Sequence, residues 1–431
     1  MTNPARPPPI AAVRPPAPRV DLFCTVVDNY GDAGVSWRLA RRLAFGHGAA
    51  VTLWIDDLAP LARMAPGVTL ATAPGPTVAG ITVRPKAAAD AAAAGVGLEA
   101  AGGGFGAADA SADAASPSAP GTAPAPGPDV VIDAFGGGAP DAYVEAIAHR
   151  PTPPLWFVLE YLSAEPWVDD AHGLPSPHPR LPLLRRFWFP GFTGRTGGLL
   201  REPGLLAARD AFRADAAARD ALWRRLGVPA PVGDEVSVTL FCYPNPRLPA
   251  LLAAWSGGSR PVRCLVPAGV AREALDAWTG GRALRVGDGG HVRGALTVHT
   301  IPFVPQDDYD RLLWAADVNF VRGEDSFVRA QWAGHPFVWQ AYPQEGGAHF
   351  AKVDAFLDRY APRFGPGAEA AIRGLFRAWN GAPTGDGVAE AWARFARARA
   401  RVDAADEAWA AELAALPELA DGLAKAAGFG L

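Results

Sequence analysis

One stretch of the chain, residues 319–344, places charged side chains between two apolar runs that are typical of buried strands. The run that ends at Val321 is followed by a short polar loop, after which Ser326 is positioned to cap a helix over 327–333. A helix start of this kind directs unpaired backbone N–H groups toward the space in front of it. The segment therefore predicts an anion site, in which Arg322 and Ser326 contact a phosphate group.

Two further carboxylates, Glu324 and Asp325, lie in the same loop. They could accept hydrogen bonds from the hydroxyl groups of a sugar. A simpler interpretation is a capped helix whose acidic residues complement its own dipole. The density of polar groups, which also include Arg329 and Gln331, favours a ligand site over a plain connection.

A second pair of carboxylates, Asp28 and Asp32, brackets a glycine-containing loop between an apolar strand at 20–27 and a helical pattern at 34–44. Open α/β sheets bind ligands at the carboxyl ends of their strands, so these carboxylates could hold or deprotonate a nucleophile. The alternative is that Asp32 only caps the helix. The loop lacks the glycine spacing of dinucleotide-binding and P-loop proteins, so a nicotinamide enzyme or a nucleoside triphosphatase is poorly supported.

Aromatic and amide side chains follow two expected strands in the second half of the chain. Phe241, Tyr243 and Phe303 could stack on a nucleobase, and Gln306 could then read its edge. Taken singly, such aromatic residues belong more often to a hydrophobic core than to a ligand site. Their expected position at strand ends, on the same side of the sheet as Arg322, favours the ligand site.

Other polar segments carry weaker signals. The glycine-rich loop at 189–202 could be a hinge between domains or a phosphate contact. No Asp-x-Asp sequence follows an expected strand, and Asp307 and Asp308 are better explained as the start of a helix. The sequence therefore gives no indication of a metal site.

Strands and helices alternate along both halves of the chain, which predicts two doubly wound α/β sheets in tandem with a cleft between them. Strands are expected at 20–27, 50–55, 129–135, 155–159, 236–241, 262–266, 296–301, 318–321 and 337–340. Helices are expected at 34–44, 143–148, 248–255, 271–278, 309–315 and through the alanine-rich end of the chain at 368–431. The terminal helices could pack back across the domain junction.

Domain boundaries follow from changes in composition. A proline-rich leader at 1–19 precedes an N-terminal domain at 20–185, a C-terminal domain at 186–370 and terminal helices at 371–431. Residues 86–128 are almost entirely small or polar, so they are predicted to form a disordered insertion. The segment at 166–190, rich in proline, histidine and tryptophan, is expected to be an irregular connection.

The composition argues against several classes of function. A formal net charge of −4 and 19% charged residues do not suggest binding to nucleic acid or to a membrane surface. No apolar run approaches the roughly 20 residues that span a bilayer. Because the leader lacks the apolar core of a signal peptide, we expect a cytoplasmic protein. Cys24, Cys242 and Cys264 each lie in a strand-like run and are interpreted as reduced core residues.

Five segments, in order along the chain, resemble the EarP family of bacterial protein-arginine rhamnosyltransferases. They are VVDNYGDAGVSWRLARRL, PGFTGRTGGLLRE, FCYPN, PFVPQDDYD and RGEDSFVRAQWAGHPFVWQAYPQ. The resemblance implies a GT-B fold, in which two Rossmann-like domains face a cleft, with the sugar donor in the C-terminal domain and the acceptor protein in the N-terminal one. It also implies transfer of rhamnose from dTDP-β-L-rhamnose to an arginine of elongation factor P, with inversion and without a metal or other cofactor. The modified factor would then rescue ribosomes stalled at polyproline.

The same resemblance implies roles for individual residues. Asp28 and Asp32 correspond to the acidic pair at the acceptor guanidinium, and Glu324 to an essential acid near the donor. Diphosphate and sugar contacts are implied for Arg322, Asp325 and Ser326, the thymidine pocket for Phe241, Tyr243, Phe303 and Gln306, and acceptor or loop contacts for Asn29, Tyr30, Gly31 and Phe192. Asp32 is the expected base and Asp28 the orienting group, although these roles could be exchanged or shared with Glu324. The alternatives are a GT-B glycosyltransferase with another acceptor and a non-catalytic nucleotide-sugar-binding protein.

Overall fold

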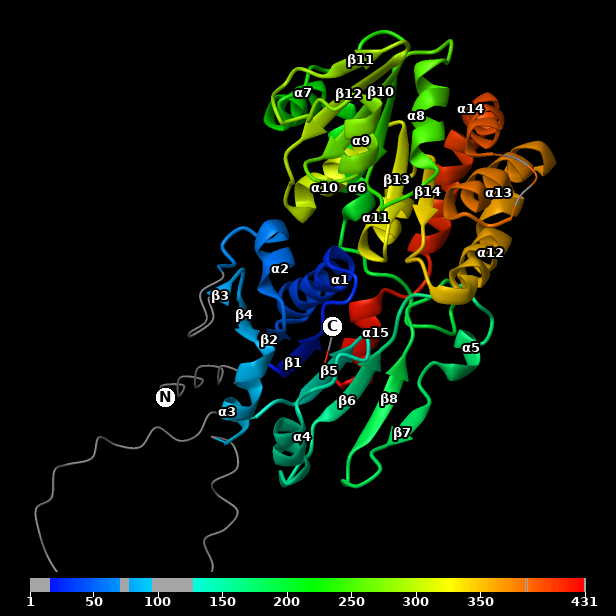
Figure 1. Ribbon diagram of the computed structural model, residues 1–431. Coiled ribbons are helices and arrows are strands. Elements are labelled where there is room, and N and C mark those ends of the chain that lie inside the picture. The colour runs from blue at the N-terminus through cyan, green and yellow to red at the C-terminus, as the bar shows by residue number, and fades with distance from the viewer. Residues whose placement is uncertain (1–15, 70–76, 95–126, 384, 386, 430–431) are drawn as a thin grey trace, which may run out of the picture.

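The computed structural model describes residues 16–69, 77–94, 127–383, 385 and 387–429 (Figure 1). Each half of the chain forms a largely parallel β-sheet with helices packed on both faces. Two doubly wound sheets in tandem are the architecture that the alternation of strands and helices predicts.

The first sheet has eight strands in the spatial order β3-β4-β2-β1-β5-β6-β8-β7, and its outer hairpins β3–β4 and β7–β8 are antiparallel. The strands are β1 (Arg19–Cys24), β2 (Ala50–Ile55), β3 (Thr77–Val78), β4 (Ile81–Pro85), β5 (Val130–Ala134), β6 (Leu155–Leu159), β7 (Pro175–Pro177) and β8 (Leu184–Trp188). The last two correct the expectation that 166–190 is irregular, and β8 runs through the boundary expected at residue 185. Pro175 and Pro177 lie in β7 at the sheet edge, where a missing N–H donor is tolerated.

Both faces of the first sheet are buried, because successive side chains of β1 enter different hydrophobic clusters. Leu22 and Cys24 pack in the cluster that includes α1 (Tyr30–Arg41), whereas Phe23 packs against Trp54 and Tyr143 on the other face. A parallel strand that is covered on both sides has a continuous apolar sequence, which explains why this strand was predictable.

The second sheet has six strands in the order β11-β12-β10-β9-β13-β14. Its strands are β9 (Val236–Leu240), β10 (Val262–Pro267), β11 (His291–Arg293), β12 (Leu296–Ile301), β13 (Val318–Arg322) and β14 (Phe337–Gln340). The five strands expected here all form, with bounds that agree to within one residue. The short antiparallel strand β11 was not predicted.

Helices surround both sheets, and the last one returns to the first sheet (Figure 1). With α1, the first half has α2 (Leu58–Met64), α3 (Ala89–Ala94), α4 (Asp141–Ala148) and α5 (Val168–Ala171). The second half has α6 (Leu205–Ala214), α7 (Ala216–Leu226), α8 (Leu248–Ser256), α9 (Arg272–Trp278), α10 (Gln306–Ala315) and α11 (Asp325–Ala333). The terminal helices are α12 (His349–Tyr360), α13 (Pro366–Asn380), α14 (Val388–Ala414) and α15 (Leu419–Ala426). Side chains of α12, α13 and α14 belong to the core of the second domain, whereas α15 packs into the first, so the helices do cross the junction.

The start of the segment 86–128 is ordered rather than disordered. A 3-10 turn over Lys86–Ala88 leads into α3, and the side chain of Ala89 is fully buried. Lys86 Nζ donates to Thr25 Oγ1 at 2.7 Å and so ties the turn to the end of β1. Alanine has the highest intrinsic helix propensity, which the compositional argument for disorder overlooked. Residues 95–126 and 1–15 lie outside the described part of the chain, so the disorder predicted there stays a prediction.

The three cysteines agree with their interpretation as core residues. Cys24, Cys242 and Cys264 are all free thiols and all buried. Among the described residues, no helix is both long enough and apolar enough to cross a bilayer.

Candidate functional site

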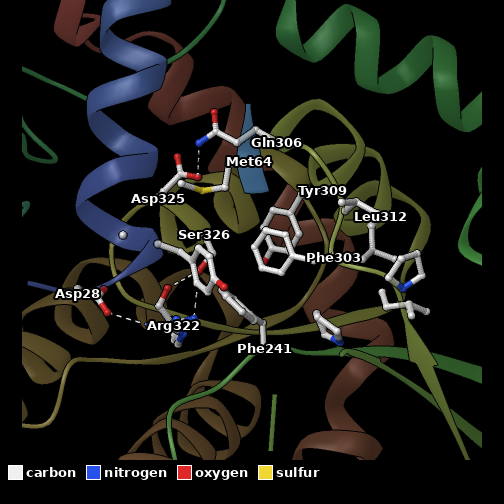
Figure 2. Close-up of a pocket in the computed structure, with 16 residues that line it drawn as sticks. Asp28, Met64, Phe241, Phe303, Gln306, Tyr309, Leu312, Arg322, Asp325 and Ser326 are labelled. Carbon is white, nitrogen blue, oxygen red and sulfur yellow. Dashed lines mark hydrogen bonds and ion pairs between the residues drawn. The ribbon is translucent and has the colours of Figure 1, made fainter. Parts of the chain in front are cut away.

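Most of the residues singled out in the sequence gather where the two domains meet, and they line two adjacent pockets. The aromatic pocket, shown in Figure 2, is defined here by Tyr30, Phe241, Phe303, Gln306, Tyr309 and Arg322. The carboxylate pocket is defined by Asp28, Asp32, Tyr161, Glu324, His349 and Lys352. Asp28 also lines the aromatic pocket, so the two sites share a wall.

Aromatic rings from both domains build the aromatic pocket. The ring centroid of Tyr30, at the start of α1, lies 4.6 Å from that of Phe303 and 6.1 Å from that of Phe241. The Phe241 ring is in turn 6.0 Å from the ring of Tyr309 (Figure 2). Tyr30, for which an acceptor or loop contact was expected, places its ring in this pocket. A concave site walled by rings is suited to a flat aromatic ligand such as a nucleobase.

Two polar atoms in the aromatic pocket are buried without partners among the described residues. Gln306 Nε2 donates to Gly34 O at 3.0 Å and to Asp325 Oδ2 at 3.2 Å, which leaves Gln306 Oε1 unpaired. The hydroxyl of Tyr309 makes no hydrogen bond of normal geometry either, although burial raises the pKa of Tyr309 and the nearby Ser326 side chain lowers it. Unpaired buried polar atoms cost free energy, so a ligand that pairs with them gains affinity and specificity. Tyr309 was not predicted, although its spacing of three residues from Gln306 on a helix places both on one face.

An ion pair separates the two pockets. Arg322 Nη1 donates to Asp28 Oδ1 at 2.8 Å, and both side chains are largely buried (Figure 2). The guanidinium carbon of Arg322 lies 4.7 Å from the ring centroid of Phe241 and 4.4 Å from that of Tyr243. Tyr243, expected to stack on a base, therefore packs against this arginine. Burial raises the pKa of Asp28, and the charge of Arg322 opposes that shift.

Two glycines leave room for the Asp28 carboxylate. A Cβ atom on Gly31 or on Gly323 would collide with Asp28 Oδ2. Gly323 also has a φ of +62°, a backbone conformation that other residues adopt only with strain. The first turn of α1 and the loop that follows β13, one from each domain, are thus shaped around a single carboxylate. Gly31, expected as a possible loop contact, contributes by its lack of a side chain.

Asp32 lies inside α1 rather than before it, because α1 begins at Tyr30 and not at residue 34. Asp32 Oδ2 accepts the backbone N–H groups of Val27 and Asp28, both at 2.7 Å. The other oxygen, Oδ1, is buried and has no hydrogen-bond partner in the described part of the chain. Burial raises the pKa of Asp32, and the two backbone bonds oppose the shift. The Tyr161 side chain, which lines the same pocket, also lowers the pKa of Asp32. One oxygen is therefore fixed by the fold, and the other has lone pairs left to accept a hydrogen bond from a ligand.

Glu324 lines the carboxylate pocket together with the two aspartates. Its Oε2 accepts the backbone N–H of Leu162 at 3.0 Å. Burial raises the pKa of Glu324 to about 8; the Leu162 bond and Lys352 oppose the shift, and the charges of Asp32 and Asp28 add to it. A cation bound among the three carboxylates would favour the ionised form of all of them. The pocket is therefore suited to a guanidinium group.

The start of α11 differs from the expected capped helix. The helix begins at Asp325, and Glu324 occupies the N-cap position without a side-chain capping bond. Ser326 Oγ accepts the backbone N–H of Arg322 at 3.1 Å and donates to Arg322 O, so it closes the turn after β13. Asp325 Oδ1 accepts Arg38 Nε at 2.8 Å, and burial raises its pKa while Arg38 opposes that shift. Ser326 and Asp325 both line the aromatic pocket, but protein groups already bind their side chains.

The last two expected contacts have different environments. Asn29 is exposed, with a φ of +43°, in the turn directly after Asp28. Phe192 is only 7% exposed and packs in the core of the second domain, where its ring centroid lies 5.6 Å from that of Phe356 and 6.1 Å from that of Trp409. Phe192 is therefore a core residue and not a contact for an acceptor. Phe356 of α12 and Trp409 of α14 pack against Phe192. The sequence around Phe192, a glycine-rich loop, does not indicate contacts with helices so far along the chain.

Sequence reasoning missed three residues of the carboxylate pocket, Tyr161, His349 and Lys352. Lys352 Nζ lies 6.0 Å from the ring centroid of Tyr161 and introduces a cation near Glu324. Tyr161 follows β6, and its position at the carboxyl end of a strand was the one signal in the sequence for a ligand-binding role. Among the residues that the structure describes, no group of three or more His, Cys, Asp or Glu side chains is arranged to hold a metal ion.

The chain matches the family model of EarP, described as elongation factor P (EF-P) rhamnosyltransferase, over residues 20–104 and 113–427. This chain belongs to the EarP family. An EarP relative from Pseudomonas putida, named protein-arginine rhamnosyltransferase, is 46% identical over 403 residues, which cover 94% of this chain and 97% of the relative. The Pseudomonas aeruginosa protein of the same name is 41% identical over 402 residues, covering 93% and 96%.

A solved EarP structure also matches this chain. That structure concerns the structural basis for EarP-mediated arginine glycosylation of translation elongation factor EF-P. The match has a TM-score of 0.62 at 34% identity and covers 94% of this chain and 97% of the other. The EarP resemblance in the five sequence motifs and the GT-B fold are thus confirmed, and the chain is a glycosyltransferase.

Proposed function

We propose that this chain transfers L-rhamnose from dTDP-β-L-rhamnose to an arginine side chain of EF-P, with inversion at the anomeric carbon. The names of the relatives support the sugar and the arginine, and the solved EarP structure supports EF-P as the acceptor. The aromatic pocket suits the thymine base, with Gln306 Oε1 and the Tyr309 hydroxyl available to its polar edge.

The observation that carries the proposal is the free oxygen of Asp32. Asp32 Oδ1 is buried and makes no hydrogen bond of normal geometry among the described residues, although the Tyr161 side chain lies close enough to lower the pKa of Asp32. It lies in a pocket that also contains the carboxylates of Asp28 and Glu324. Three carboxylates held together away from water repel one another and raise each other's pKa. A protein that only binds a nucleotide sugar has no use for such an arrangement, whereas an enzyme that activates a cationic nucleophile does.

The chemistry requires a guanidinium to act as a nucleophile. Its pKa of about 12 or more and its delocalised lone pairs make it unreactive as it stands. Asp28 and Asp32 would hold it and localise its charge on the nitrogens that face them. One nitrogen then attacks the anomeric carbon as the bond from that carbon to the phosphate oxygen breaks. The bonding electrons leave with dTDP, Asp32 accepts the proton, and the single displacement converts the β-linked sugar into an α-linked one.

The leaving group requires positive charge where dTDP departs. Arg322 lies between the aromatic pocket and Asp28, so in this scheme its guanidinium faces the diphosphate, assisted by the N-terminal turn of α11. Asp28 would then exchange Arg322 for the acceptor arginine. Asp325 and Ser326 would support this turn rather than contact the donor through free side chains. The scheme needs no metal ion or other cofactor.

We also propose that the modified EF-P rescues ribosomes stalled at polyproline, so that the enzyme acts in the cytoplasm. The description of the EarP family supports EF-P as the protein that is modified, and the role at stalled ribosomes is what the resemblance to that family implies. In this scheme the acceptor is a protein, and the exposed Asn29, directly after Asp28, is available to contact it.

The test is the intact mass of EF-P after incubation with this chain and dTDP-rhamnose. We expect the mass of one deoxyhexose to be added, at one arginine by peptide mass spectrometry and as the α-anomer by NMR. EF-P whose acceptor arginine is replaced by lysine is the matched control and should gain nothing. If EF-P stays unmodified while the chain still binds dTDP in calorimetry, EF-P is not the acceptor and the proposal fails at that step.

A further inference from the structure

Helix α1 carries an arginine that the proposed chemistry does not use. Arg38, less than two turns after Asp32, is 1% exposed and reaches from the first domain into the second. Its Nε donates to Asp325 Oδ1 at 2.8 Å, its Nη2 to Asp310 Oδ1 at 2.9 Å and its Nη1 to Glu202 Oε1 at 3.1 Å. A single guanidinium thus uses all three nitrogens to bind carboxylates that lie outside its own domain's sheet.

A second arginine, Arg329 of α11, binds the same acidic groups. It donates to Asp310 Oδ1 at 2.9 Å and Oδ2 at 2.6 Å, and to Glu202 Oε2 at 2.8 Å. Burial alone would raise the pKa of Glu202, but Arg329 and Arg38 lower it below its usual range. Because Arg329 can hold Asp310 and Glu202 within the second domain, the particular contribution of Arg38 is to bring α1 to them.

The partners of Arg38 lie on the helices that build the aromatic pocket. Asp310 belongs to α10, which starts with Gln306, and Asp325 is the first residue of α11. A second link between the same elements is the bond from Gln306 Nε2 to Gly34 O of α1. Helix α1, which carries Asp32, is therefore joined to α10 and α11 by the bonds of Arg38 and by the bond of Gln306 to Gly34. Figure 1 shows α1 against the second domain at this place.

We propose that Arg38 is a positioning residue, which holds α1 against α10 and α11 so that Asp32 and the aromatic pocket keep their working separation. Arg38 lines neither pocket, so its replacement can change nucleotide affinity only through Asp325, Gln306 or the placement of the domains. A misplacement of about 1 Å between reacting groups lowers turnover about 100-fold. The inference rests on the proposed function, and its first readout, dTDP binding, needs no acceptor.

The test compares Arg38→Met with Arg42→Met. Arg42 follows on the same helical segment, is 6% exposed and pairs with Glu418 at 3.1 Å and with Asp421 at 2.8 Å. These partners lie at the start of the terminal helix α15, so Arg42 matches Arg38 in burial and charge, but its bonds among the described residues do not reach α10 or α11. Arg38→Lys, which keeps the charge and loses the fork of donors, is the conservative variant. Each variant is measured for dTDP affinity, turnover at saturating substrates and melting temperature.

We expect Arg38→Met to weaken dTDP binding and to lower turnover of the folded protein about 100-fold. Arg38→Lys should recover part of both losses, whereas Arg42→Met should lower the melting temperature and leave dTDP affinity and turnover within twofold. If Arg38→Met is too unstable to assay, the comparison of Arg38→Lys with Arg42→Lys decides in the same way. Equal losses in the Arg38 and Arg42 variants, or unchanged binding and turnover in folded Arg38→Met, would overturn the inference. Absence of dTDP binding by the unmutated chain would instead overturn the proposed function.

Discussion

The aromatic and carboxylate pockets are neighbours with opposite physical character. In the aromatic pocket, rings surround two unpaired polar atoms and one arginine, so recognition depends on shape and stacking. In the carboxylate pocket, Asp28, Asp32 and Glu324 crowd negative charge into a partly buried space. Burial of rings is favourable before any ligand arrives, whereas burial of a carboxylate is unfavourable unless a cation pairs with it, as Arg322 does with Asp28. The aromatic pocket is therefore suited to binding the donor, and the carboxylate pocket to activating the acceptor.

The Asp28–Arg322 ion pair marks the border between these two kinds of environment. Each partner belongs to a different domain, and each faces a different pocket in the proposed scheme. Changes to residues on either side of this border should therefore affect different measured quantities. Three predictions test that separation, and they are arranged by the size of the expected effect.

Replacing Asp32 by Asn should give the largest effect. The amide keeps the shape of the side chain but cannot accept the proton, so turnover should fall about 1,000-fold. The affinity for dTDP should stay within twofold, because Asp32 does not line the aromatic pocket. Turnover is followed by intact mass of EF-P and dTDP binding by calorimetry. A loss of dTDP affinity as large as the loss of turnover would give Asp32 a structural role and remove the separation.

The second prediction concerns pH. Burial raises the pKa of Glu324 to about 8, so the free enzyme holds this group mainly neutral below that pH and ionised above it. If the ionised form receives the acceptor arginine, kcat/KM for EF-P should rise about 100-fold between pH 6 and pH 9. The dissociation constant of dTDP, measured over the same range, should change far less.

Glu324→Gln is the matched control for this profile, since it cannot titrate. Its residual kcat/KM should lose the rise that has its midpoint near the pKa of Glu324. A profile in the unmutated enzyme that is flat from pH 6 to pH 9 would show that Glu324 is already ionised or does not meet the acceptor.

Replacing Phe241 by Ala should give the smallest effect of the three and act on the other pocket. Loss of one aromatic stacking surface is worth about 1 kcal/mol, so dTDP affinity should fall about fivefold. Turnover at saturating donor should stay within threefold of that of the unmutated enzyme. Calorimetry with dTDP and a donor-saturation curve check the two values. Since Phe241 also packs against Arg322, a large loss of turnover at saturation would mean that its main role is to hold that arginine.

Much of the fold was predictable because buried parallel strands have continuous apolar sequences. The strands at 50–55, 155–159, 296–301 and 337–340 form with the expected bounds. The hairpin β7–β8 was missed because its prolines indicate turns, although they are tolerated at a sheet edge. The first turn of α1 was missed because the sequence there contains Gly31 and Asp32, which are more typical of a loop before a helix.

The site was predictable where a strand end and a motif coincide, and less so elsewhere. Asp28, Asp32, Glu324 and Arg322 come together as their positions after β1 and β13 suggested. Phe192 did not, because an aromatic residue in a glycine-rich loop gives no sign of the distant helices that bury it. Lys352 gave no signal either, since its segment contains no motif with a chemical meaning.

The sequence by itself determined which strands form, which residue types lie at their ends, and the family to which the chain belongs. These properties depend on local hydrophobic patterns and on motifs that are continuous in the chain. Only the tertiary structure decided the partner of each charged group, such as Arg38 with Asp310 and Asp325, or Asp28 with Arg322. Those pairs join residues more than 250 positions apart. The environment that sets the pKa of Glu324 likewise exists only once both domains exclude water from the space between them.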